Sequence, residues 1–429
     1  MTNIDKRIAW LYCLSLIVCV YMPSFKVFDK ASSQYFFISI LNTISLLVLP
    51  WSFKQLDLKK HFNHPLLLLY IGFIFISIIS IISSINIIES FVKLFQLITF
   101  FISLAIIMLF AFRRVIKVDS ILTLVGISLL FDMYYSLMGY IPFLLNNIEY
   151  NYDQNYRLVG LYGNRNILAT LLCFKIPFVA LLAYRKKDIT YTIISLIILT
   201  VAFFNITLLS SRATYLSIII SIAFILIIFL ILYNKKLYIN YFFRNTLLLF
   251  IPIIFAFVMS SYAIDSKDEG AVVNRISTIA STSDVSKNTR LRYYEHAITH
   301  TLKNPFLGGG IGNWKIISLK YDSENIENYI IPYNAHNDFL EAFAETGILG
   351  GLLYLLFFLY IPFCFLRNLK TKIFDKYEFT QSVILFIPFI VYFVDLNLNF
   401  PSSRPSNQVV LLLYIALVML TQSKIDEKT

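Results

Sequence analysis

The sequence predicts an all-α polytopic membrane protein, because it is apolar, poorly charged and organised in long hydrophobic runs. Of its 429 residues, 58% are hydrophobic and 14% are charged, and the mean hydropathy is +0.72. A soluble domain is about half apolar and about a quarter charged. Runs of about 20 apolar residues, long enough to cross roughly 30 Å of hydrocarbon as helices, recur along the chain. Short charged breaks separate these runs.

Twelve apolar runs qualify as transmembrane spans, with boundaries predicted to within several residues. In chain order they cover residues 8–25, 36–53, 65–84, 91–112, 121–145, 164–184, 191–210, 213–233, 246–263, 336–366, 380–396 and 408–423. The chain therefore divides into three parts. Residues 1–263 hold nine spans, residues 264–335 form a polar loop, and residues 336–429 hold three spans.

The polar loop between spans nine and ten is too long for a simple connector, which predicts a partly helical cover over the membrane. Apolar residues recur at helical spacing from 289 to 303, and Asn304-Pro305 ends this pattern. The glycine-rich run 308–314 follows, and we interpret it as a flexible turn that allows close approach of the backbone.

The distribution of positive charge predicts the orientation. Twenty lysines and arginines lie in the segments that share a side with the termini, and seven lie in the opposite short loops. The positive-inside rule then places both termini in the cytoplasm and the polar loop outside. The net charge of +11 follows this topology, and its scatter along the chain argues against nucleic-acid binding. All four cysteines, Cys13, Cys19, Cys173 and Cys364, fall in predicted spans, so we predict no disulfide.

Several ionisable residues lie at or within membrane depth in the predicted spans, where an unpaired charge costs several kcal/mol. We expect Lys175, about two turns from the cytoplasmic end, to snorkel to the interface. For Asp132 and Asp395, a hydrogen bond between helices and a functional role both remain open. Glu341 and Glu345 could orient a site or face a wet cavity.

The best candidate for a general base is His336, which lies where the polar loop meets span ten. An imidazole with a pKa near neutrality can take the proton of an attacking hydroxyl. His296 and His300 have i, i+4 spacing, which could hold a metal. No third ligand arrives at a signature distance, so a solvated helical face is favoured and no metal site is predicted.

Three arginines are candidates for binding an anion. Arg212 lies at the external end of a span, and Arg290 and Arg292 lie at the start of the loop helix. Helix N-terminal amides favour anions, and the planar guanidinium fork suits diphosphate oxygens. The alternative is that these cations bind anionic lipid head groups or solvate the loop.

These residues resemble the O-antigen ligase superfamily, which includes O-antigen polymerases and bacterial protein O-oligosaccharyltransferases. His336-Asn337, followed after nine residues by Gly347 and then Gly350, is similar to the ligase signature. Arg212 with Leu216 resembles the Arg-x3-Leu element of the family, and Arg290 with Tyr294-Glu295 resembles its loop arginine. GLYGNRNILA at 160–169 and NPFLGGGIGNW at 304–314 are similar to further landmarks. The resemblance covers about residues 160–351 and the twelve-span plan.

The resemblance implies a GT-C-like glycosyltransferase of the bacterial inner membrane. It would move a glycan from undecaprenyl diphosphate to an acceptor hydroxyl at the periplasmic face, with inversion and without cofactor or metal. By resemblance, Arg212 and Arg290 would hold the diphosphate and His336 would act on the acceptor. Further substrate contacts would come from Asn337, Tyr333, Asn334, Arg292 and Arg165.

The acceptor distinguishes the alternatives within the superfamily. It is lipid A-core for a ligase, a second carrier-linked repeat unit for a polymerase, and a Ser or Thr hydroxyl for a protein transferase. The complete ligase signature favours a ligase, with a polymerase second. The short segment after span twelve argues against a protein transferase. A lipid or solute transporter would predict two related halves and broken helices, and the sequence shows no internal repeat.

Overall fold

The computed structural model confirms the all-helical fold. It describes residues 3–26, 29–52, 61–146, 148–278, 285–325 and 333–422. Parts of the predicted segments, among them residues 279–284 and 326–332 of the polar loop, lie outside these ranges. Within them there is no β-strand, and one isolated bridge joins Tyr150 to Ile264.

Each predicted span overlaps one long helix, whose bounds differ from the predicted ones by several residues. The helices are α1 (Asn3–Val20), α2 (Lys30–Ser52), α4 (Pro65–Ser80), α5 (Ile87–Phe112), α6 (Val118–Leu145), α7 (Arg165–Lys186), α8 (Ile189–Leu209), α9 (Arg212–Asn234), α10 (Ile239–Ala263), α14 (Asp338–Lys372), α15 (Lys376–Leu398) and α16 (Pro405–Gln422). Ten helices of the described chain are long and apolar enough to cross a membrane. Helices α1 and α16 are not among these ten, so the number of twelve spans stays a prediction.

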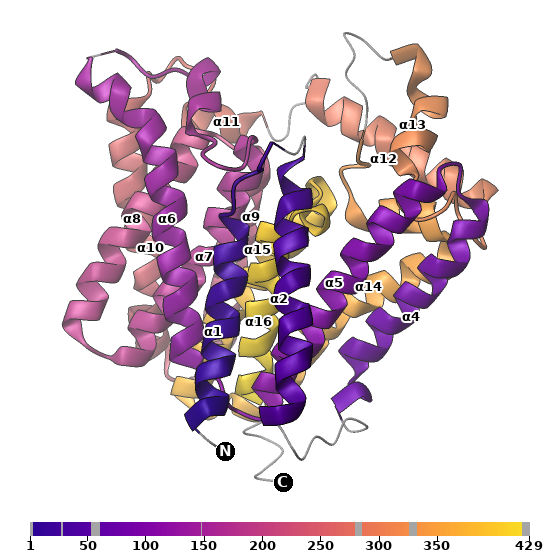
Figure 1. Ribbon diagram of the computed structural model, residues 1–429. Coiled ribbons are helices and arrows are strands. Elements are labelled where there is room, and N and C mark those ends of the chain that lie inside the picture. Colours follow the sequence, from indigo (N-terminus) through magenta and orange to yellow (C-terminus); the bar gives the residue numbers. More distant parts are fainter. Residues whose placement is uncertain are drawn as a thin grey trace.

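The predicted loop helix is confirmed as α12 (Val285–Lys303), which α11 (Val272–Ser277) precedes and α13 (Trp314–Asp322) follows. We call residues 264–278, 285–325 and 333–337 the cap. Helices α11, α12 and α13 lie at the end of the bundle opposite the start of α1 (Figure 1). The short helices η1 (Ile81–Ser83), η2 (Tyr152–Leu158) and η4 (Pro401–Ser403) connect spans at the cap end.

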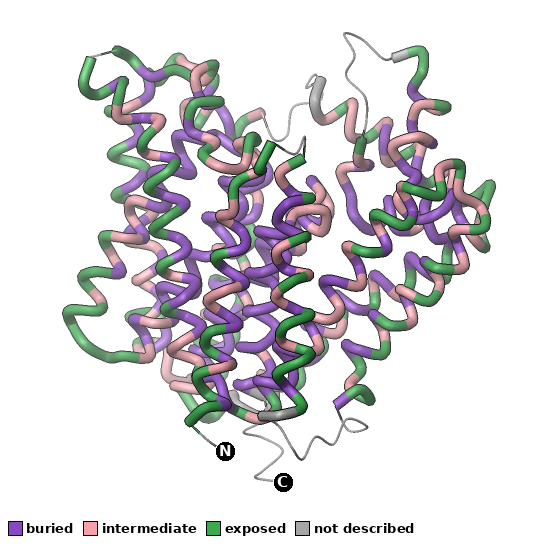
Figure 2. The backbone as a smooth tube through the Cα atoms, in the orientation of Figure 1, coloured by how far each residue is buried: buried purple, intermediate pink, exposed green. Residues whose placement is uncertain are grey.

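Burial separates central from peripheral helices. The most apolar stretch is 94% buried in α7 and 89% buried in α15, but only 28% buried in α10. Figure 2 shows the buried residues gathered along the middle of the bundle and the exposed ones along its outer helices. Isoleucine, leucine and phenylalanine side chains are exposed on the peripheral helices. Apolar surface of this extent is typical of contact with lipid.

The buried charge in α7 is paired within the bundle, so the expected snorkelling of Lys175 is wrong. Its side chain is buried, and Nζ lies 2.5 Å from Oδ2 of Asp132 on α6. The hydroxyls of Tyr21 and Tyr162 donate to Oδ1 of this carboxylate at 2.8 Å and 2.6 Å. A partner within reach explains the inward orientation, because an ion pair with further hydrogen bonds offsets much of the cost of burying both charges.

A kink at Gly347 joins α14 to the cap. Its φ of 73° lies in the left-handed region, and a Cβ there would come within 2.5 Å of the Phe306 carbonyl oxygen. In an unbroken helix the amide of Ile348 would donate to the carbonyl of Ala344. Instead Ile348 donates to Pro305 at 2.8 Å, and Gly309 donates to Ala344 at 2.9 Å. The glycine loop, residues 304–312, thus replaces the hydrogen bonds that the kink breaks.

Candidate functional site

The His336 side chain lies between aromatic rings from two other segments. Its ring stacks on Tyr293 of α12, with ring centroids 6.2 Å apart and planes at 19°, and meets the edge of Phe400 at 5.3 Å. Its Nδ1 atom is buried and has no hydrogen-bond partner among the described residues. This half-buried imidazole is held by aromatic contacts.

The backbone of His336 is held in a conformation that non-glycine residues seldom adopt. Its φ is 55°, in the left-handed region. The Tyr294 hydroxyl donates to the His336 carbonyl at 3.1 Å and to that of Asn397 at 2.7 Å. On one side of His336, the amide of Ala335 donates to Glu341 at 2.9 Å. On the other side, the Asn337 side chain caps α14 by accepting from its first amides. These contacts fix the direction of the imidazole.

Arg290 lies close enough to His336 for its charge to act on the ring. Burial, and after it the positive charge of Arg290, lowers the pKa of His336 to about 4. The imidazole is therefore neutral at physiological pH and able to accept a proton. Arg290 is one turn before Tyr294 on α12, so the helix that carries the arginine also holds the His336 turn. The catalytic roles of Arg290 and His336 remain predictions.

Arg212 is the first residue of α9, beside a second group of arginines. Arg165, which begins α7, and Arg275 of α11 both donate to the Tyr152 hydroxyl and lie over its ring, 4.2 Å and 4.5 Å from the centroid. Arg275 also donates from Nε to the carbonyl of Ser210 at 3.1 Å, two residues before Arg212. These contacts bring Arg165 to the start of α9. Sequence reasoning missed Arg275, which is one cation in the short segment VVNRIS and has no motif to single it out.

Asp395 of α15 lies between the two groups of arginines. It is within electrostatic reach of Arg290 and close to Thr170, one to two turns into the helix that Arg165 begins. Asn399 donates to its Oδ1 at 2.6 Å, and Asn407 to its Oδ2 at 3.3 Å. The carboxylate thereby ties the end of α15 to the start of α16. Asp395 thus has the structural role that the sequence left open.

The other sequence candidates occupy different surroundings. Arg292 makes a two-point ion pair with Asp322 of α13, at 2.7 Å from Nε and 3.4 Å from a terminal nitrogen. Asn337 is the helix cap described above, and its amide nitrogen lies 3.4 Å from Oδ1 of Asn397. Tyr333 is 61% exposed and Asn334 is half-buried, both in the turn before His336. Arg292 and Asn337 therefore hold cap elements together.

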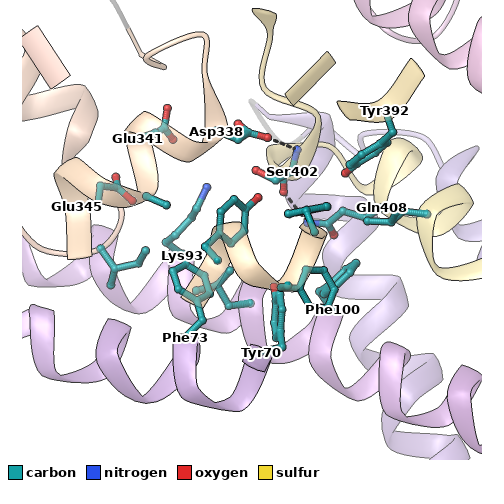
Figure 3. A pocket seen from close by; sticks show the side chains of 17 residues that line it. Tyr70, Phe73, Lys93, Phe100, Asp338, Glu341, Glu345, Tyr392, Ser402 and Gln408 are labelled. Carbon is teal, nitrogen blue, oxygen red and sulfur yellow. Dashed lines mark hydrogen bonds between the residues drawn. The ribbon is translucent and has the colours of Figure 1, made fainter. Parts of the chain in front are cut away.

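A small cavity lies between α4, α5, α14, α15 and α16, and its mostly apolar lining includes several ionisable side chains (Figure 3). Asp338, Glu341 and Glu345 project into it from one face of α14, opposite Lys93 of α5. Each carboxylate accepts a backbone amide at 2.9 Å, and the donors belong to Ser402, Ala335 and Trp314 respectively. The acidic residues therefore fasten three separate segments to the start of α14, which is the site-orienting role considered for Glu341 and Glu345.

The volume of this cavity decides what it can hold. It measures about 40 Å³, and a buried water needs at least about 10–15 Å³ on such a scale. The hydroxyls of Tyr354 and Tyr392 line it without a hydrogen-bond partner in the described chain. The cavity has room for about three waters and is too small for a sugar. We therefore interpret the carboxylates that line the cavity as structural groups, one of which, Glu341, holds the turn that carries His336.

Comparison with known proteins agrees with the motifs. The family model described as O-antigen ligase matches residues 196–355, a segment that begins within α8 and contains Arg212, Arg290 and His336. No curated protein matches the chain. This match covers less than half of the chain, and together with the fold it supports a resemblance to O-antigen ligase or polymerase types of membrane glycosyltransferase. The predicted resemblance to the O-antigen ligase superfamily is confirmed.

Proposed function

We propose that the protein transfers a glycan from undecaprenyl diphosphate to a hydroxyl of lipid A-core, as an O-antigen ligase, at the periplasmic face of the bacterial inner membrane. The observation that carries this proposal is the pairing of a neutral imidazole, His336, with a guanidinium, Arg290, at the cap end of an apolar bundle. This pairing offers a base beside a site for an anionic leaving group.

The transfer proceeds by a single displacement. The acceptor oxygen attacks the anomeric carbon, and the bond from this carbon to the diphosphate oxygen breaks, so that undecaprenyl diphosphate leaves with the electron pair. The proton of the acceptor hydroxyl passes to the His336 imidazole. Arg290 and Arg212 stabilise the charge that grows on the diphosphate, which is electrostatic catalysis. Attack opposite the leaving group inverts the anomeric carbon.

Binding of the donor would also activate the base. In the free protein, burial and the Arg290 charge keep the pKa of His336 low, which makes the imidazole a weak base. A bound diphosphate beside Arg290 would offset the positive charge of this arginine, and an opposite charge nearby favours the protonated imidazole. The pKa of His336 would rise toward neutrality, where a general base works best. Proton transfer would then depend on an occupied donor site.

The environment of Arg212 is compatible with a lipid-linked donor. An apolar pocket lies between α7, α8, α9, α10 and α15, and Ile218, Ile222 and Ile225 of α9 line it. These positions are about two to four turns below Arg212 on the same helix. A carrier with its diphosphate at Arg212 would extend its prenyl chain toward this apolar region. We include this direction of the prenyl chain in the proposed function.

The alternative is an O-antigen polymerase, because the same base and arginines would serve a carrier-linked acceptor. The lipopolysaccharide of a strain that lacks the gene distinguishes the two functions. For a ligase, we expect loss of all O-antigen from lipid A-core and accumulation of carrier-linked polymer. A core that carries one single repeat unit would instead identify a polymerase.

Sidedness can be tested with an impermeant thiol reagent in intact cells stripped of the outer membrane. Lys236→Cys should be shielded, and Lys267→Cys in the cap should be labelled. The four native cysteines are buried, so background labelling should be low. Labelling of position 236 but not of position 267 would place the site in the cytoplasm and overturn the proposed reaction.

A further inference from the structure

The cap contains a second cavity that is separate from the His336 turn. A cleft of about 500 Å³ opens between η1, the last turn of α12, the glycine loop and α13. Small-molecule sites are typically about 300–1,000 Å³, so this cleft, unlike the 40 Å³ cavity that Glu341 lines, can hold a sugar. None of the residues with assigned roles in the proposed transfer lines it.

The cleft is positively charged. Lys303 projects from α12 and Lys320 from α13, and no aspartate or glutamate of the described chain lines the cleft. The charges of both lysines, after burial, contribute to lowering the pKa of His300 between them. Both lysines are exposed, and two cations with no carboxylate beside them in the described lining favour an anionic ligand, with an attraction that salt should weaken.

The remaining lining offers hydrogen-bonding groups beside an aromatic ring. The Nδ1 atom of His300 lies 3.2 Å from the Tyr321 hydroxyl and 3.4 Å from the Asn304 amide nitrogen, and its buried Nε2 atom has no partner in the described chain. The ring of Tyr321 stacks on His296 at 5.7 Å. The face that His296 and His300 share is half-buried, because both rings contact Tyr321 of α13. Nζ of Lys303 lies over the Tyr321 ring, 5.4 Å from its centroid. Imidazole, amide and phenol groups suit the hydroxyls of a sugar.

The cleft and the proposed transfer site lie at different ends of α12. Lys303 and Arg290 belong to the same helix, thirteen residues apart, which corresponds to about 20 Å at a rise of about 1.5 Å per residue. A glycan with its reducing end at Arg290 could follow α12 and reach the cleft several sugar units away. The separation makes the cleft a site for a distant part of the glycan.

We propose that this cleft binds an anionic saccharide, a sugar unit that carries a carboxylate or phosphate group. The proposal rests on the proposed function, because it requires a glycan at His336. Lys303 and Lys320 bind the anionic group, while His300 and Asn304 bind hydroxyls. The saccharide could belong to the donor glycan or to the acceptor, and both present the same chemistry to the cleft.

Direct binding tests the proposal without relying on turnover. Purified protein in nanodiscs is titrated with tri-galacturonate, with glucose 6-phosphate and with neutral maltotriose. We expect the wild type to bind at least one of the two anionic sugars, more weakly at high salt, and maltotriose poorly. The Lys303→Gln/Lys320→Gln variant should lose about ten-fold or more in affinity, because charge-assisted contacts are the strong ones. Lys303→Arg/Lys320→Arg should retain binding, which separates lost charge from misfolding.

The matched control is Lys267→Gln, an exposed cap lysine outside the cleft. It should bind as the wild type does. Wild-type protein that binds neither anionic sugar, or a double glutamine variant with unchanged affinity, would overturn the proposal even if the enzyme transfers glycan normally. In a transfer assay, a raised KM for the carrier-linked glycan identifies the donor as the source, and a raised KM for the glycolipid identifies the acceptor. Binding without any transfer by the wild type would contradict the proposed function alone.

Discussion

Replacing Tyr294 by phenylalanine tests how the His336 turn is held. The change removes one hydroxyl, which donates to the carbonyls of His336 and Asn397. A net hydrogen bond contributes about 0.5–1.5 kcal/mol, and the left-handed backbone of a residue such as His336 costs about 1–2 kcal/mol. The two quantities are similar, so without the hydroxyl the turn should relax in much of the population.

We expect the rate of transfer at saturating substrates to fall about 10- to 100-fold, because each 1.36 kcal/mol corresponds to about ten-fold. Donor affinity should stay within about two-fold, since Arg290 remains in place on α12. The matched control is Tyr293→Phe, which keeps the ring stacked on His336. Both variants are assayed with purified protein and carrier-linked glycan. An unchanged rate for Tyr294→Phe, or an equal loss in both variants, would refute the argument.

Three further predictions concern the base, the arginines and the kink. Protonation of His336 should abolish transfer as the pH falls through its pKa, which is near 4 in the free protein. Because the bound donor raises this pKa, the acidic limb of the kcat profile should lie at higher pH than that of the kcat/KM profile. Acidic limbs at the same pH in both profiles would contradict activation of the base by the donor. The Arg212→Lys and Arg290→Lys variants should lose most of their transfer activity, whereas Arg292→Lys should keep its activity and lose at most about 1 kcal/mol of stability. If Arg292→Lys loses activity and the other two variants keep it in the same assay, the diphosphate site must be assigned to other residues. Gly347→Ala should lower the thermal stability in detergent far more than Gly163→Ala. Both glycines have a positive φ, but a Cβ at Gly163 would meet no atom within 4 Å. Equal losses would count against close contact between Gly347 and the glycine loop.

The length of the apolar runs is sufficient to find the helices, because a span must satisfy its backbone internally over a length set by the bilayer. Each predicted span therefore overlaps a helix. Partners between helices were not predictable from one helix alone. Lys175 was expected to reach the interface because Asp132 lies on another helix, and only packing of α6 against α7 brings the two together.

The site shows the same division. His336 and Arg290 were found because a titratable ring and a cation at a change of polarity are visible in the sequence. Tyr293 and Phe400, which hold the imidazole, are aromatic residues in a chain with 28 tyrosines and 40 phenylalanines, so nothing in the pattern singles them out. The contacts of Glu341 and Glu345 are visible only in the structure. Glu341 accepts the amide of Ala335 in the turn before α14, and Glu345 accepts the amide of Trp314 at the start of α13.

Reconstituted transfer tests the central claim most directly. Purified wild-type protein and the His336→Ala variant are placed in liposomes with carrier-linked glycan and lipid A-core, and the products are separated by electrophoresis. We predict that the wild type attaches the glycan to lipid A-core and releases one undecaprenyl diphosphate per transfer, also in the presence of a chelator. His336→Ala should be slower by about 10²- to 10⁴-fold, the contribution of a positioned base. Equal rates for the two proteins, or a lengthened carrier-linked glycan with unmodified lipid A-core, would contradict the account.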